Sequence, residues 1–232
     1  MGGCVIDPAS NASVNAHRAP AVDVRVAVFS VNDGALQIAE MHAGDEWSLP
    51  RTVPAVAGSL DAHARRLITE EWAIPIRYLE QLYTLSVETG RGWTVVVSYL
   101  ALVDRPPVQV RAIRWTDVDK VDLDETDRMV LDYAVTRLRA KVGYTTIAFR
   151  LIPAPFTLSD VQSTYEAILD RPLDKRNFRR RLSAAAVLVS TGEKRRDGSH
   201  RPAVLYTARI GDDQEAYLTP SWSQSLNDSE LP

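Results

Sequence analysis

The order of elements predicted for residues 156–209 constrains the fold of this 232-residue chain more than any other feature. Thr157, followed three residues later by Asp160, has the pattern of a capped helix start. Asp174 is a second candidate N-cap, and the pattern predicts a second helix over 175–186. Two short runs of strand-forming residues follow, separated by a basic segment with an Asp-Gly turn. Two helices followed by a hairpin predict a winged helix-turn-helix domain.

Charge is distributed unevenly along the chain. The net charge of the whole sequence is only -3, whereas residues 171–209 alone carry +8. Residues 1–170 carry -6 and residues 210–232 carry -5. A strongly positive module within an acidic protein indicates a polyanionic partner, and a helix-turn-helix pattern favours double-stranded DNA.

The second predicted helix has one apolar and one polar face. Phe178 and Leu182 lie four residues apart, so we expect them to face the core. Arg176, Asn177 and Arg180 then lie on an exposed stripe, where arginine can recognise guanine and asparagine can recognise adenine in the major groove. In the predicted hairpin, phosphate contacts are expected from Lys194, Arg195, Arg196, His200 and Arg201.

The region before residue 150 alternates strand and helix patterns. β-Branched runs predict strands over 24–31, 35–41, 81–88, 93–103 and 109–116. The spacing of apolar residues predicts helices over 59–72 and 124–141. These elements suggest a sandwich of helices around a mixed sheet, and the prolines of residues 150–155 predict a linker after it.

Two segments of this region resemble the Nudix box, which ends in R-E-U-x-E-E-x-G-U, where U is aliphatic. The segments are Trp47-Ser-Leu-Pro50 and residues 66–74. The matching residues are Arg66, Ile68, Glu70, Glu71 and Ile74. The departures are Leu67 in place of the first glutamate, Gly58 in place of an upstream glutamate, and Thr52 and Ala73 at the two glycines.

These departures weaken the case for hydrolysis. Nudix chemistry uses Mg²⁺ or Mn²⁺, which require carboxylate oxygens. In an α-helix, positions 67, 70 and 71 would share one face, but leucine cannot ligate a metal. We therefore expect no catalytic residue and no metal site. In the simpler alternative, Glu70 and Glu71 are surface charges paired with Arg66.

A Nudix-like domain joined to a basic winged helix resembles the Nudix-related transcriptional regulators, the NrtR family. The signature stretches are Phe156-Thr-Leu-Ser159, Leu173–Arg180, Thr191–Arg196 and His200-Arg-Pro-Ala203. The resemblance implies an α+β protein, with a Nudix-like α/β/α sandwich and mixed sheet before a C-terminal winged helix-turn-helix. It divides the chain into a flexible tail (1–20), a Nudix-like effector and dimerisation domain (21–148), a linker (149–155), a DNA-binding domain (156–209) and an acidic tail (210–232).

Such a resemblance implies a homodimeric repressor of NAD biosynthesis or salvage genes that binds an inverted-repeat operator. No cofactor is required, and the implied effector is ADP-ribose, NAD or a related metabolite. The implied DNA-binding residues are Lys175, Arg176, Asn177, Arg179, Arg180, Lys194, Arg195, Arg196, His200 and Arg201. The implied ligand-binding residues are Arg51, Arg66, Glu70 and Glu71.

Two other functions remain open. The chain could be a constitutive DNA-binding regulator whose Nudix-like domain is only a dimerisation scaffold, or a weak Nudix hydrolase. We expect a cytoplasmic protein without a membrane span, because no run of about 20 apolar residues is present and the only cysteine is Cys4. If an effector regulates the protein, we expect it to change the angle between the domains through residues 150–155 or the 124–141 helix.

Overall fold

A mixed sheet forms the N-terminal part of the protein. The computed structural model describes residues 20–55, 57–89, 92–106, 113–196 and 202–209. The seven-stranded sheet has the order β3-β2-β1-β6-β5, with β4 paired to β1 and β7 paired to β2. Its strands are β1 (Ala21–Asn32), β2 (Ala35–Ala43), β3 (Glu46–Ser48), β4 (Arg51–Thr52), β5 (Tyr78–Thr89), β6 (Gly92–Leu102) and β7 (Ile113–Asp117). β1 and β6 are parallel and the other pairs are antiparallel, which confirms the predicted mixed sheet.

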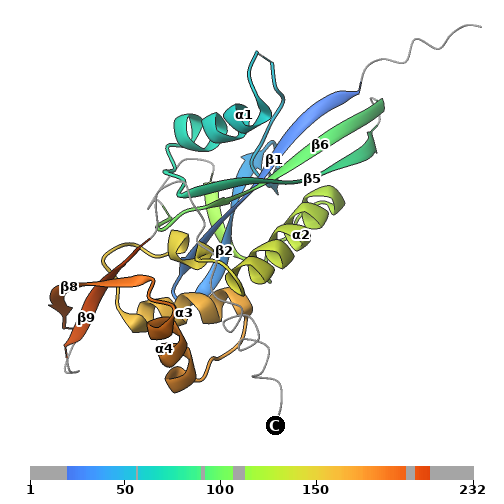
Figure 1. Cartoon of the computed structure of the whole chain (residues 1–232). Coiled ribbons are helices and arrows are strands. Elements are labelled where there is room, and N and C mark those ends of the chain that lie inside the picture. The colour runs from blue at the N-terminus through green and yellow to red at the C-terminus, as the bar shows by residue number, and fades with distance from the viewer. Residues whose placement is uncertain (1–19, 56, 90–91, 107–112, 197–201, 210–232) are drawn as a thin grey trace, which may run out of the picture.

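One layer of helix covers each face of this sheet (Figure 1). Side chains alternate along β1, so Val26 and Val28 face the layer of α1 (Leu60–Arg66), while Ala27 and Phe29 face α2 (Glu125–Val142). Both faces of β1 are fully buried, which explains its continuous apolar run. The expected α/β/α sandwich is therefore confirmed.

The predicted helix over 59–72 divides into two kinds of helix. Ser59 caps α1 by accepting a hydrogen bond from the amide of Ala62. From Leu67 to Glu71 the chain forms a π-helical turn, η1. Leu67 and Ile68 are buried, whereas Glu70 and Glu71 are exposed. The prediction that residues 67, 70 and 71 share one face was wrong for this reason.

The apolar first half of the segment predicted as a linker is buried. After α2 the chain forms a 3₁₀ helix, η2 (Ile147–Leu151), and Phe149, Leu151 and Ile152 are all at most 6% exposed. They belong to the same hydrophobic cluster as residues from the sheet, α2 and the C-terminal helices. Only residues 153–155 of this segment lie at the surface, so the prolines mark a short surface turn rather than a free linker.

Two helices and a hairpin complete the fold: α3 (Leu158–Leu169), α4 (Lys175–Ala184), β8 (Leu188–Arg195) and β9 (Ala203–Ala208). Thr157 and Asp160 form the predicted capping box, and Asp174 caps α4 through the amide of Asn177. Tyr165 of α3 packs edge-to-face on Phe178 of α4, with ring centroids 5.2 Å apart. None of the helices in the described ranges is long and apolar enough to cross a membrane.

Candidate nucleic-acid interface and ligand site

α4 presents the polar stripe that its sequence predicts. Phe178 and Leu182 are at most 3% exposed, and both pack into the common core. Lys175, Arg176, Asn177, Arg180 and Ser183 are exposed. The helix therefore shows guanidinium, ammonium and amide groups to solvent along one side, as a helix that enters a major groove requires.

Arg179 lies apart from that stripe. It is half-buried, and one guanidinium nitrogen donates to Ser159 Oγ at 3.2 Å. This contact joins α4 to the first turn of α3, so Arg179 helps to hold the two helices together. This contact could not be predicted from the sequence, because the partners lie 20 residues apart.

The hairpin distributes its basic residues in two ways. Lys194 and Arg196 are exposed, whereas Arg195 forms an ion pair with Asp160 at 2.9 Å. Burial raises the pKa of the Asp160 carboxyl, but hydrogen bonds from Arg195 and from the Thr157 amide outweigh it and leave the pKa below its usual value. Arg195 thus fastens the hairpin to the start of α3. The predicted contacts His200 and Arg201 lie outside the described residues.

The predicted ligand residues lie near the Nudix-like motif at the surface. Arg51 on β4 and Glu70 on η1 are exposed, and Arg66 Nε lies 3.8 Å from Glu71 Oε1. Leu67 is 2% exposed and packs with the core beneath α1. Gly58 has φ +153°, a conformation that glutamate rarely adopts. In the described part of the chain, no group of three or more His, Cys, Asp or Glu side chains could hold a metal ion.

Buried charges elsewhere in the Nudix-like part are paired within the protein. Glu40 is fully buried and receives two hydrogen bonds of 2.8 Å from Arg114, together with one from Thr116. Glu80 receives hydrogen bonds from Arg137 at 2.6 Å and Lys141 at 2.7 Å. Such internally satisfied groups hold the layers together and leave little capacity for a ligand.

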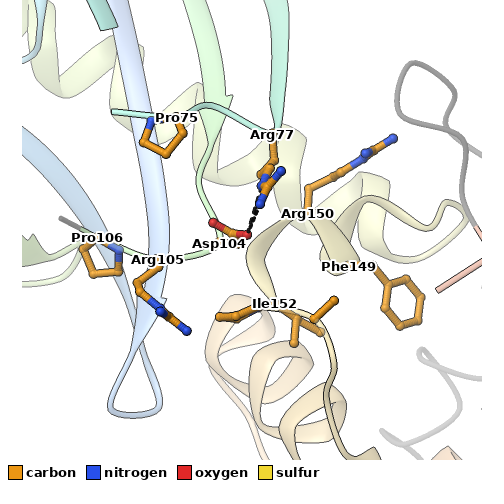
Figure 2. Close-up of a pocket in the computed structure, with 10 residues that line it drawn as sticks. Pro75, Arg77, Asp104, Arg105, Pro106, Phe149, Arg150 and Ile152 are labelled. Atoms are coloured by element: carbon orange, nitrogen blue, oxygen red, sulfur yellow. Dashed lines mark hydrogen bonds and ion pairs between the residues drawn. The ribbon is translucent and has the colours of Figure 1, made fainter. Parts of the chain in front are cut away.

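A cavity of about 610 Å³ at the junction of the two parts was not predicted (Figure 2). Arg77 and Asp104 come from the Nudix-like part, and Arg150 and Ile152 come from the segment that leads into α3. None of Arg51, Arg66, Glu70 and Glu71 lines it. The sequence could not reveal this cavity, because three distant segments form it and one of them was interpreted as a linker.

The comparisons with known proteins agree across most of the chain. The family model described as the NrtR DNA-binding winged helix domain matches residues 148–208. The ADPR responsive transcriptional repressor NtrR of Acinetobacter baylyi is 32% identical over 210 residues, covering 83% of this chain and 84% of that protein.

Solved structures give the same result for the fold. Shewanella oneidensis NrtR complexed with a 27-mer DNA aligns with a TM-score of 0.71 and 27% identity, covering 88% of this chain and 95% of that one. A MutT/nudix family protein from Enterococcus faecalis aligns with a TM-score of 0.65 at 18% identity, covering 84% and 90% of the two chains. The second likeness concerns the fold alone.

Proposed function

The chain belongs to the NrtR family of Nudix-related transcriptional regulators, and from this premise we propose that it is a DNA-binding repressor of NAD biosynthesis or salvage genes. The observation that carries the proposal is the exposed polar stripe of α4, beside a hairpin with exposed Lys194 and Arg196. A homodimer would present two such helices to the half-sites of an inverted repeat. A repressor meets chromosomal DNA in the cytoplasm of a bacterium, which is where we place the protein.

The proposed DNA contacts differ in role. Lys175, Arg176, Asn177 and Arg180 would enter the groove, and Lys194 and Arg196 would contact phosphates. Arg179 and Arg195 are bonded to α3, so we propose that they contribute chiefly by holding the recognition helix and the hairpin in place.

We further propose that the Nudix-like domain senses ADP-ribose or a related NAD metabolite and does not hydrolyse it. The Acinetobacter relative is an ADPR responsive transcriptional repressor, which supports a sensing role for this domain. Leu67 is buried and Gly58 has a backbone that disfavours glutamate, which leaves two adjacent carboxylates as the remnant of the motif. Arg51, Arg66, Glu70 and Glu71 are the proposed ligand contacts, without a metal or a required cofactor.

The test is a fluorescence-anisotropy titration of the full chain on promoter DNA from NAD biosynthesis genes, at a fixed salt concentration, with and without ADP-ribose and NAD. We expect specific binding that one of these metabolites weakens. Specific binding that neither metabolite changes would favour the constitutive regulator. Absence of specific binding, together with phosphate or nucleotide release in Mg²⁺, would favour the hydrolase.

Arg180→Ala tests the recognition helix. If Arg180 recognises a base, the variant should lose roughly 1–3 kcal/mol of operator binding and much less of its affinity for unrelated DNA. Arg65→Ala, which removes an exposed arginine from α1, is the matched control and should bind as the wild type does. Equal losses on both DNAs would make Arg180 a phosphate contact.

A further inference from the structure

We propose that the cavity at the junction of the Nudix-like domain and the winged helix binds a small phosphate-bearing molecule. The cavity lies where the ends of the Nudix-like strands meet η2, the short helix that precedes α3 (Figure 2). This proposal goes beyond the effector site at the Nudix-like motif and does not depend on it, because the four residues proposed there line no part of this cavity.

Arginine dominates the charge of the cavity. Arg77, Arg105 and Arg150 line it from three separate segments, and Asp104 is the only acidic residue among the described residues of the lining. The Asp104 carboxylate accepts a 2.9 Å hydrogen bond from Arg77 Nε and lies 2.9 Å from Arg77 Nη2 as an ion pair, which fixes the position of that side chain. Three guanidinium groups and one carboxylate leave a net positive charge in a chain whose overall charge is negative. Guanidinium groups bind phosphate through charge-assisted and often bidentate hydrogen bonds.

Arg105 is the arginine most available to a ligand. Its side chain is exposed, and among the described residues no carboxylate lies within ion-pair distance of it. Figure 2 shows its guanidinium pointing toward Ile152, whereas the Arg150 side chain points away from it. A phosphate held by Arg105 and Arg77 would therefore contact the Nudix-like domain, while the rest of the ligand would lie against η2.

The remaining walls favour an organic molecule over a bare ion. Pro75, Pro106, Ile152 and Pro153 give the lining a large apolar part. A volume of about 610 Å³ is far larger than phosphate needs and falls in the range of small-molecule sites. The chemistry of the cavity thus matches a phosphate group attached to an apolar or planar portion, as in a mononucleotide.

The shape of the site distinguishes this ligand from duplex DNA. A duplex contacts exposed convex features such as α4, whereas these arginines line a hollow between two domains. The same arginines could instead contact a phosphate of the DNA backbone. The experiment therefore also measures DNA binding.

The test is isothermal titration calorimetry of the full chain with AMP and with inorganic pyrophosphate as probes. We expect AMP to bind, and Arg105→Gln to weaken that binding at least tenfold while the melting temperature stays unchanged, because the side chain is exposed. Arg65→Gln removes an exposed arginine on α1, outside the cavity, and should leave AMP binding unchanged.

Three results would overturn the proposal. The first is no binding of AMP or pyrophosphate to the wild type at millimolar concentration. The second is AMP binding that Arg66→Ala abolishes and Arg105→Gln leaves intact, which would place the probe at the Nudix-like motif. The third is unchanged AMP binding with weaker DNA binding and a smaller salt dependence in Arg105→Gln, which would make this arginine a DNA phosphate contact. Operator binding by the wild type is measured separately, so failure of the repressor proposal would be distinguishable.

Discussion

At the scale of single residues, the buried pair Arg25–Asp127 is the most consequential contact. Asp127 in the first turn of α2 is fully buried, and its carboxylate accepts a 2.5 Å hydrogen bond from Arg25 of β1. Its second oxygen accepts a 2.9 Å hydrogen bond from the backbone amide of Leu49. One carboxylate thus joins β1, α2 and the chain before β4, which are three parts of the Nudix-like layer structure.

Asp127→Ala should destabilise the protein strongly. The substitution removes the fully buried partner of Arg25 and leaves Asp23 at 3.0 Å and Asp124 at 3.7 Å, so we expect a loss of about 3 kcal/mol, the lower end of the cost of breaking a buried pair. Urea denaturation followed by circular dichroism measures this loss. Lys120→Ala is the control, because Lys120 pairs with Asp117 at an exposed site, where an ion pair contributes little to stability. Similar losses in the two variants would show that Arg25 finds compensation elsewhere.

At the scale of elements, one ion pair links the hairpin to α3, in addition to the backbone bridge between Phe156 and Tyr206. Asp160 has a pKa below its usual value in the folded protein, so its contribution to stability is present above the ordinary aspartate pKa of about 4 and is lost as the pH falls through the folded value. Arg195→Ala removes the ion pair and should lower the melting temperature above pH 5. The difference from the wild type should shrink below about pH 4. Arg196→Ala, at an exposed neighbouring position, should match the wild type throughout, and a pH-independent difference for Arg195→Ala would contradict this account.

Helix caps and apolar spacing in the sequence correctly predicted several helices and strands. The caps at Thr157 and Asp174, the apolar pair Phe178 and Leu182, and the sheet could all be inferred from the sequence, because each depends on neighbours a few residues away or on a regular period. The π turn at Leu67 could not be inferred, because an α-helix and a π turn share nearly the same apolar pattern. The roles of the individual site residues remain predictions.

Contacts between distant segments could not be predicted from the sequence, for a different reason. Arg195 looked like a further basic residue of the hairpin, yet its partner Asp160 lies 35 residues earlier. Arg77, Arg105 and Arg150 are unremarkable surface charges in the sequence, and only the fold brings them to one cavity. Neither hydrophobic periodicity nor a sequence motif shows which distant residues come together. The cavity at the domain junction was therefore found only in the structure.

At the scale of the whole molecule, the two domains share one hydrophobic core. The cluster that contains Phe29 of β1 and Leu138 of α2 also contains Phe156, Tyr165 and Leu182 of the winged helix. η2 lies between the two parts with its apolar side chains buried. We therefore propose that a signal from the Nudix-like domain would pass to the DNA-binding helices through packed α2 and η2, because Leu151 and Ile152 of the predicted 150–155 linker are buried in the shared core.

A shared core predicts that the domains unfold together. Differential scanning calorimetry of the full chain should show a single transition, because melting either part exposes the apolar surface of the other. Leu151→Ala, at the joint, should lower that one transition by an amount equivalent to about 2–5 kcal/mol, since Leu151 is only 1% exposed. Val53→Ala truncates an apolar side chain that is 65% exposed, so its transition should change little. The contrary result would be two separate transitions in the wild type, with Leu151→Ala shifting only one of them. That result would show that the winged helix folds independently. The signal from the Nudix-like domain would then cross a weaker contact than this packing implies.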